Sequence, residues 1–254
     1  MRSHRHDAIR IAARLLGWML VTSGLALVLT HRHDARAIEK LSADVRVRQQ
    51  TTAGEAPGIG ISSGPDWESL KAINPDVAAW VRVENTDIDL PVMAPSDADM
   101  TYYLQHDLWR KASLDGTPFL DHRCEADARQ RLVYGHHLFL GGQFSALQRA
   151  YRQEVFEKTG DCVWSTPSGG TTRLKPLCAL RRNAWFAGIQ RFDLPPDQLE
   201  SWLLDLSGEA EATAANCEQL AKEACSTVAL VTCSSELSGQ PWRTIVVFVE
   251  VGSG

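Results

Sequence analysis

The feature that most limits the fold of this chain is a series of short apolar runs rich in β-branched and aromatic residues. After Val77 these runs are AAWVRVENTDIDLPVM, GTPFLDHRC, RLVYGHH, DCVWSTP, TRLKPLCALRR, VALVTCSS and RTIVVFVEV. Glycine, proline and Asn or Asp clusters separate them, as they separate the strands of a barrel or a sandwich. The sequence therefore predicts a domain built mainly from β-strands.

Helices are predicted between these runs and ahead of them. The segments between the runs are residues 98–106, 141–160 and 195–214. Pro195 and Pro196 open the last segment, where the first turn of a helix accepts proline. A further short helix should start after Asp66 and stop before Asn74. Because the strand runs outnumber the helices, the predicted fold class is mainly β (α+β), a closed barrel with peripheral helices.

The length and charge of the chain exclude some classes of function. The 254 residues suit one domain with appendages, and the formal net charge is −5. Neither a basic stripe nor an interleaved aromatic and basic motif is visible, so nucleic acid is not an expected partner. No repeat of roughly 20–50 residues is visible either, which argues against a solenoid or a propeller.

The N-terminus predicts a membrane anchor. Residues 15–30, LLGWMLVTSGLALVLT, are uncharged, and with the preceding AIRIAA the apolar segment reaches about 20 residues, the length of a spanning helix. The arginines ahead of this segment favour a cytoplasmic N-terminus. A cleaved signal peptide with a weak ARA site is the alternative. The predicted location is the cell membrane, with a single pass and the folded domain outside the cell.

Composition divides the chain into three predicted regions. Residues 1–30 form a cytoplasmic tail and membrane anchor. Residues 31–65 form a juxtamembrane helix and a linker, TTAGEAPGIGISSGP, rich in Gly, Ser, Thr and Pro. Residues 66–254 form the folded domain, which holds all the strand runs.

A cysteine and an arginine occupy strand ends that should lie next to each other. The run VALVTC ends at Cys233, and the next run begins around Arg243. The connection SSELSGQP allows an antiparallel pair, in which these two positions face each other. A thiolate is a nucleophile, and an arginine can donate hydrogen bonds to the oxyanion of an acyl transfer. The alternative is that Cys233 is a small core residue or half of a disulfide.

Two adjacent histidines stand in the segment YGHHLFLGGQFSAL. Successive residues of a strand point to opposite faces, so only one of His136 and His137 can face a common site. One histidine, together with Cys233 and Arg243, would complete a minimal acyl-transfer site, because imidazole exchanges protons near neutral pH. Alternation alone does not say which histidine this is.

These segments together resemble the sortases, membrane-anchored cysteine transpeptidases of Gram-positive cell walls, and among them class B. The family has a T-L-x-T-C motif where this chain has ALVTC, with Ala229 in place of the leading Thr, and an arginine at the start of the following strand. YGHHLFLGGQFSAL is similar to the family's Y-G-H-N-M segment with its glycine-rich turn and MFxxL. The upstream NPDVAAWVRVENTDIDLPVM and YYLQHDLWRKASLDGTPFLDHR also resemble class B segments. The resemblance spans roughly residues 66 to 251.

The resemblance implies a sortase-type closed barrel of about eight strands and a catalytic domain at 66–254. It implies that Cys233 attacks the carbonyl of a threonine in a C-terminal sorting signal and forms a thioacyl-enzyme. His136 aligns with the family histidine as general acid and base, Arg243 holds the substrate carbonyl or oxyanion, and His137 falls where the family often has Asn.

The protein would then be transferred to an amine, from a peptidoglycan cross-bridge or a pilin lysine. The implied partners are a surface protein or pilin with a sorting signal related to NPQTN or LPxTG, the amine acceptor, and the membrane. Two other functions stay open: a cysteine peptidase with water as the acceptor, and a non-catalytic anchored β-barrel binding module.

Cofactors and disulfides complete the expectations. Most class B members are calcium-independent and the chain has no calcium-loop spacing, so no metal or other cofactor is expected. The six cysteines of an exported domain permit disulfides. On one unbroken helix Cys217 and Cys225 would lie ~12 Å apart, beyond the ~4.4–6.8 Å Cα separation of a disulfide, so they can bond only if the chain turns between them. We expect this pair as a disulfide, and Cys233 as a free thiol. Cys162 and Cys178 flank PSGG and would be cross-strand neighbours in a hairpin centred there.

Overall fold

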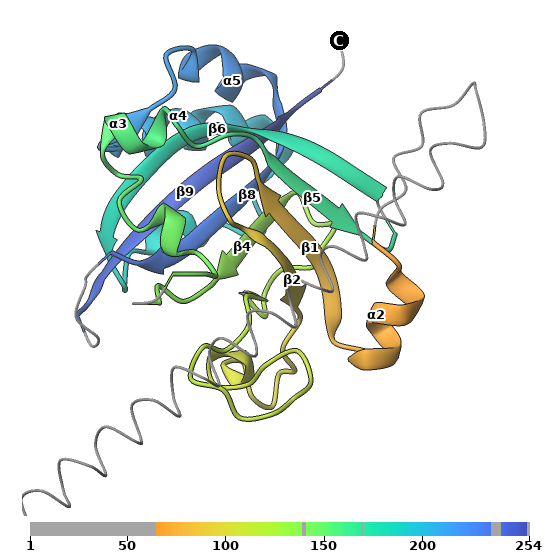
Figure 1. The fold of residues 1–254 in the computed structure, drawn as a ribbon. Helices are drawn as coiled ribbons and strands as arrows, with labels where there is room; N and C mark the ends of the chain where they lie inside the picture. Colours follow the sequence, from red (N-terminus) through yellow and green to blue (C-terminus); the bar gives the residue numbers. More distant parts are fainter. Residues whose placement is uncertain (1–64, 139–140, 169, 235–239, 253–254) are drawn as a thin grey trace, which may run out of the picture. The chain divides into compact units, whose positions relative to one another are not determined.

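The computed structural model describes residues 65–138, 141–168, 170–234 and 240–252 (Figure 1). Strands make up most of its regular structure. They are β1 (Val77–Val83), β2 (Asp89–Met93), β3 (Phe119–Leu120), β4 (Gln130–Tyr134), β5 (Cys162–Thr166), β6 (Gly170–Asn183), β7 (Ala212–Thr213), β8 (Ala224–Cys233) and β9 (Trp242–Val251). The α-helices are α2 (Trp67–Ile73), α3 (Gln153–Phe156), α4 (Leu199–Glu209) and α5 (Cys217–Glu223). Short 3₁₀ turns are η1 (Tyr102–Leu104), η2 (Ser145–Leu147), η3 (Ala187–Ile189) and η4 (Pro196–Gln198).

The strands form one sheet that closes on itself. Their order is β5-β1-β2-β3-β4-β8-β9-β6-β7, and β5 also pairs with β6. The ring therefore contains eight of the nine strands, and β7 is an addition beside β6. The pairs β2–β3 and β4–β8 are parallel, so the barrel is mixed. The predicted closed barrel of about eight strands is confirmed.

The two longest C-terminal strands are buried on both faces. In β8 every residue from Ser226 to Thr232 is buried, and β9 is buried from Thr244 to Val249. Their near-continuous runs of Val, Ile, Leu and Thr follow from this, because a strand covered on both sides needs no polar face. One face looks into the barrel, and helices cover the other.

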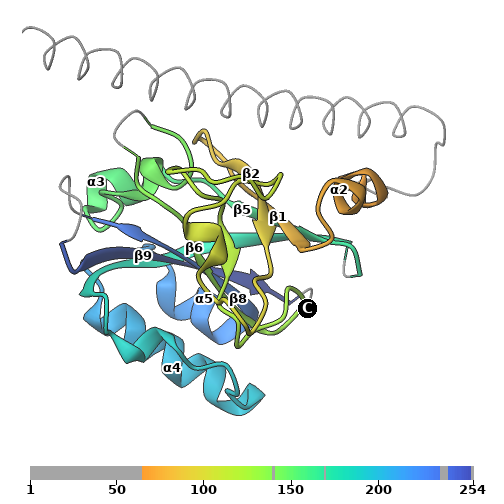
Figure 2. The same cartoon turned by 90° about the horizontal axis from the view of Figure 1, so that it is seen from below.

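Helices α4 and α5 cover the outer face of this part of the barrel (Figure 2). Leu203 and Leu206 of α4 belong to one hydrophobic cluster with Val231 of β8 and Ile245 of β9. The Trp202 ring contributes to the same cluster, and its Nε1 donates a hydrogen bond to the Gly188 carbonyl at 2.9 Å. The predicted helix ahead of the cysteine strand is confirmed, although it is shorter than 195–214.

The first described helix follows its sequence signal. The Asp66 carboxylate accepts hydrogen bonds from the backbone N–H of Ser69 at 3.1 Å and from its hydroxyl at 2.8 Å. This is the N-cap arrangement that satisfies free amides at a helix start. The helix ends before Asn74, whose side chain donates to the Tyr103 hydroxyl and the Leu108 carbonyl.

The helix predicted over residues 141–160 is not continuous. Gly141, Gly142 and Gln143 have φ angles of 83°, 92° and 44°, which a right-handed helix does not accept. Only η2 and the four-residue α3 form in that segment. Conversely, α5 forms where no helix was predicted, and the end of the predicted helix 195–214 becomes β7.

The predicted cell-membrane location needs correction. Among the helices of residues 65–252 that the structure describes, none is long and apolar enough to cross a membrane. The longest, α4, has 11 residues, against about 20 for a spanning helix. The single-pass assignment with an extracellular catalytic domain therefore has no support. The proposed span and the regions 1–30 and 31–65 lie outside the described residues, and the domain division stays a prediction.

Candidate active site

Cys233 and Arg243 lie directly opposite each other on neighbouring strands. In the antiparallel β8–β9 pair the register places Cys233 against Arg243 and Thr232 against Thr244. The pair of strands continues one step further, because the Ser234 N–H donates to the Trp242 carbonyl at 3.1 Å. The facing positions predicted from the sequence are thus observed, and the ladder on both sides fixes them.

His136 reaches the same edge of the barrel through a different pairing. Strand β4 runs parallel to β8, with Tyr134 beside Val231, and the Gly135 N–H donates to the Val231 carbonyl at 3.0 Å. His136 follows Tyr134 by two residues, and Cys233 follows Val231 by two residues. Side-chain alternation continued from Tyr134 and Val231 assigns both to one face, and His137 to the other. Figure 1 shows β4, β8 and β9 side by side at this point.

The imidazole of His136 has a defined hydrogen-bond partner. Its Nε2 lies 2.9 Å from the Leu104 carbonyl oxygen in η1. A carbonyl only accepts, so Nε2 carries the hydrogen and Nδ1 is the nitrogen left for proton exchange. The backbone is also held, because the His136 N–H donates to Oε1 of Gln143 at 2.9 Å and the Phe144 N–H donates to the His136 carbonyl.

Leu104 and Gln143 were not identified from the sequence. A main-chain carbonyl such as that of Leu104 leaves no trace in a residue pattern. Gln143 sat inside a predicted helix, so its side chain was assigned no function. The YGHH segment alone therefore indicates the histidine but not what orients it.

Two arginines lie side by side next to the cysteine. Nη1 of Arg243 donates to the carbonyls of Gln240 and Trp242, at 2.9 and 3.0 Å. Its neighbour across the β6–β9 ladder is Arg182. Arg182 has carboxylate partners, since it contacts Glu211 at 2.8 Å and Glu209 at 3.7 Å. Its charge is therefore balanced locally, whereas the described partners of Arg243 are backbone carbonyls.

The six cysteines differ strongly in environment. Cys233 is a free, half-buried thiol at a strand end. Cys162 and Cys178 are fully buried, and burial raises the pKa of each thiol to about 12. Burial likewise raises the pKa of Cys124 to about 11. These three are protonated at neutral pH and are poor candidates for a nucleophile.

The predicted disulfide is not present. Cys217 and Cys225 are both free. Helix α5 begins at Cys217 and runs to Glu223, so the chain does not turn back before Cys225 in β8. The hairpin of β5 and β6 places Cys162 opposite Leu174, four positions from Cys178, so these two are not cross-strand neighbours either.

A group of polar side chains lies around the buried Asp121 carboxylate and includes Tyr134, the last residue of β4 before the histidine. The Tyr134 hydroxyl donates to Asp121 at 2.9 Å, and Arg123 holds both carboxylate oxygens of Asp121 at 2.8 Å. Burial by itself raises the pKa of Asp121, but the hydrogen bonds from Arg123 and Tyr134 lower that pKa below its ordinary value. Burial and the nearby Asp121 charge raise the pKa of Tyr134. The group ties β4 to the end of β3.

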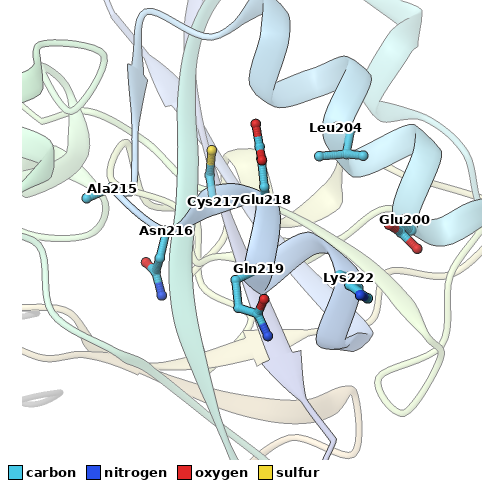
Figure 3. Close-up of a pocket in the computed structure, with 8 residues that line it drawn as sticks. All are labelled: Glu200, Leu204, Ala215, Asn216, Cys217, Glu218, Gln219 and Lys222. Atoms are coloured by element: carbon cyan, nitrogen blue, oxygen red, sulfur yellow. The ribbon is translucent and has the colours of Figure 1, made fainter.

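A separate hollow of about 660 Å³ lies between α4 and α5 (Figure 3). Its lining residues are Glu200, Leu204, Ala215, Asn216, Cys217, Glu218, Gln219 and Lys222. None of the three predicted catalytic residues lines it. Within the described parts of the chain, no cluster of three or more His, Cys, Asp or Glu side chains could hold a metal ion.

Comparison with known proteins places this geometry in a family context. No protein-family model matches the chain. The chain is 31% identical over 97 residues to sortase B of Staphylococcus aureus (strain NCTC 8325 / PS 47), which covers 37% of this chain and 38% of that protein. It is 29% identical over 82 residues to sortase B of Listeria monocytogenes serovar 1/2a, which covers 32% of each. The matched segment thus spans less than half of either relative.

Solved structures extend the similarity to most of the chain. A Staphylococcus aureus sortase B–substrate complex matches 89% of this chain and 100% of its own, with a TM-score of 0.72 and 21% identity. A sortase B complexed with triglycine covers 88% and 100%, with a TM-score of 0.71 and 20% identity. Clostridium perfringens sortase B covers 74% and 100%, with a TM-score of 0.63 and 22% identity. At these identities the structures establish the sortase fold. Together with the sequence matches, this fold makes the chain similar to class B sortases.

Proposed function

We propose that this protein is a cysteine transpeptidase of the sortase type. The observation that carries the proposal is the meeting of three strand ends. The β8–β9 register sets Cys233 opposite Arg243. The parallel β4–β8 pairing extends to Tyr134 and Val231, and side-chain alternation continued two residues further would put His136 on the face of Cys233. A nucleophile, a proton carrier and an oxyanion donor are the groups that acyl transfer needs.

In the proposed first step, the Cys233 thiolate attacks the carbonyl carbon of a threonine in the substrate. The carbonyl oxygen becomes an oxyanion, and Arg243 donates hydrogen bonds to it. The intermediate collapses with cleavage of the C–N bond to the next residue. Protonated His136 gives its Nδ1 proton to the leaving amine, while Nε2 keeps its bond to the Leu104 carbonyl. The products are a thioester on Cys233, a free amine and a neutral imidazole.

The second step regenerates the enzyme. An amine attacks the thioester carbonyl, neutral His136 takes one proton from it, and the Cys233 thiolate leaves. A new amide bond joins the substrate to the acceptor. The proposed donor is a protein with a C-terminal sorting signal, and the proposed acceptor is a peptidoglycan cross-bridge amine or a pilin lysine. The similar sortase B structures complexed with substrate and with triglycine support this pairing of donor and acceptor.

The test is a peptide assay on the purified full chain. Labelled peptides of the NPQTN and LPxTG types are incubated with and without triglycine, and products are separated by mass. We expect a ligated product that depends on triglycine. Cys233→Ala should reduce the rate at least ~10³-fold, because in the proposed mechanism the Cys233 thiolate is the nucleophile. Cys225→Ser is the matched control, since Cys225 is an exposed thiol at the opposite end of β8, and it should keep the wild-type rate.

Two results would reject the proposal in different directions. Cleavage that ignores triglycine would identify a cysteine peptidase with water as acceptor. A wild-type protein that neither cleaves nor ligates any of the peptides, yet binds them equally well as Cys233→Ala, would identify a binding module.

A further inference from the structure

A buried glutamine holds the loop that follows the proposed catalytic histidine. Only 9% of Gln143 is exposed. Its Oε1 accepts a hydrogen bond from the His136 N–H at 2.9 Å, and its Nε2 donates to the Gly116 carbonyl at 2.9 Å and to the Asp115 carbonyl. The two ends of one side-chain amide thus connect the backbone of His136 to the backbone of Asp115 and Gly116.

The backbone of Gln143 is in an unusual conformation. Its φ is +44°, in the left-handed region that few non-glycine residues occupy. Such a conformation costs free energy and persists only where the surroundings impose it. The backbone of Gln143 also forms an isolated bridge with His137. With this backbone conformation, the side-chain amide of Gln143 reaches the backbone N–H of His136.

The segment that Gln143 contacts also orients the imidazole. Gly116, whose carbonyl accepts from Gln143, packs so closely on η1 that a Cβ added there would lie 2.7 Å from the Leu104 carbonyl oxygen. That same oxygen is the partner of His136 Nε2. The histidine backbone and the histidine ring are therefore both fixed to residues 104–116, the first through Gln143 and the second directly.

We propose that Gln143 is a positioning residue for His136. Its side chain fixes the backbone of His136 and thereby the position of the imidazole relative to the ends of β4 and β8. The expected effect of Gln143 on the reaction rate rests on the proposed function. Its expected effect on the position of His136 rests on the hydrogen bonds alone. It assigns Gln143 no contact with the substrate. Loss of the side-chain amide should therefore impair turnover and leave substrate affinity in place.

The first test compares two variants of the same loop in the ligation assay. Gln143→Met keeps the length and volume of the side chain but has neither the acceptor nor the donors. We expect kcat to fall ~10- to 100-fold, the range expected for a misplaced catalytic group, with KM within about twofold of wild type. Ser145→Ala is the control, because the Ser145 hydroxyl bonds to Leu138 in this loop without touching His136. It should change kcat by less than about threefold. Equal losses in the two variants would overturn the proposal.

The second test does not depend on turnover. The described hydrogen bond of the His136 amide is to the Gln143 side chain, so Gln143→Met should accelerate hydrogen exchange of that amide at least ~10-fold while Ser145→Ala should not. Gln143→Glu retains the acceptor for His136 but loses the donors to Gly116, and should give an intermediate rate. It also serves if Gln143→Met does not fold. An unchanged His136 amide would overturn the inference. Wild-type inactivity on all peptides would instead reject the proposed function, and the exchange result would then decide the positioning role alone.

Discussion

At the scale of single residues, Asp121 shows how a buried carboxylate depends on its neighbours. It is 5% exposed, and its carboxylate accepts four hydrogen bonds, three from Arg123 and one from Tyr134. Since its folded pKa is lowered, the folded state binds protons less readily than the unfolded chain does at this site. The stability from the ionised carboxylate is present above the unfolded value of about 3.9 and is lost as pH falls through the folded pKa.

We therefore expect Asp121→Asn to be destabilised by about 2 kcal/mol at pH 7, the size of a buried hydrogen bond to a charged group. The difference from wild type should shrink as the pH is lowered below about 3.9 and through the folded pKa, because the wild-type carboxylate then becomes protonated. Urea unfolding of both proteins across this pH range measures it. A difference that stays constant with pH would contradict the assignment of the effect to ionisation.

At the scale of secondary-structure elements, Arg181 contacts residues at the ends of both β8 and β9. Arg181 of β6 lies opposite Thr244 in the ladder, on the face away from Cys233. Its Nε donates to the Ser234 hydroxyl at 3.3 Å, and its guanidinium lies 5.1 Å from the Trp242 ring and 5.3 Å from the Tyr151 ring. It thus contacts the residue after the cysteine and the residue before the arginine.

Removing that guanidinium should loosen both strand ends. For Arg181→Met, which keeps the apolar stem, we expect a loss of about 1–2 kcal/mol from two cation–π contacts and one hydrogen bond. Thermal and urea unfolding measure the loss. Arg173→Met is the control, because Arg173 forms exposed ion pairs with Glu84 and Asp161, which contribute little. Equal losses of stability in the two variants would show that the contacts of Arg181 with Tyr151 and Trp242 contribute no more than exposed ion pairs do.

The elements also show what could be predicted from the sequence. The β-branched runs gave the strands of the barrel because each run is short, apolar and bounded by turn residues. The prediction of a long helix at 141–160 is wrong because Gly141 and Gly142 have positive φ angles, which turn the chain where a helix would begin. Helix α5 has only seven residues, and its buried Leu220 and Ala221 pack against the core, so its formation depends on tertiary contacts more than on a local pattern. The opposite positions of Cys233 and Arg243 could be predicted from the length of the loop between their strands. The hydrogen bonds of His136 to Leu104 and Gln143 could not be predicted, because they depend on tertiary contacts that no local pattern contains.

At the scale of the whole molecule, a buried arginine stabilises the barrel at the end away from the cysteine. Arg131 is 4% exposed, and burial lowers its pKa. Its Nε donates to the Thr227 carbonyl at 3.0 Å and its Nη2 to the Ser226 hydroxyl, which in turn donates to Glu250 at 2.5 Å. This chain of bonds crosses from β4 through β8 to β9.

Arg131→Ala should therefore weaken the whole barrel rather than one strand. We expect a loss of about 3 kcal/mol, because the truncation leaves a void and unpaired acceptors among buried strands. The free energy of urea unfolding gives the value, with exposed Arg129→Ala as the matched control. A loss no larger than that of the control would show that water replaces the guanidinium at no cost.

The β4–β8 pairing affects the order in which the parts of the barrel form during synthesis and folding. It joins residues 96 positions apart in sequence, as Arg131 and Thr227 show. During synthesis β4 emerges long before β8 and β9, so the histidine has no thiol beside it while the sheet keeps an open edge. Closing such a distant pairing is slow. On the proposed function, a growing chain therefore has Cys233 and His136 apart, and completion of the barrel is the step that assembles the proposed active site.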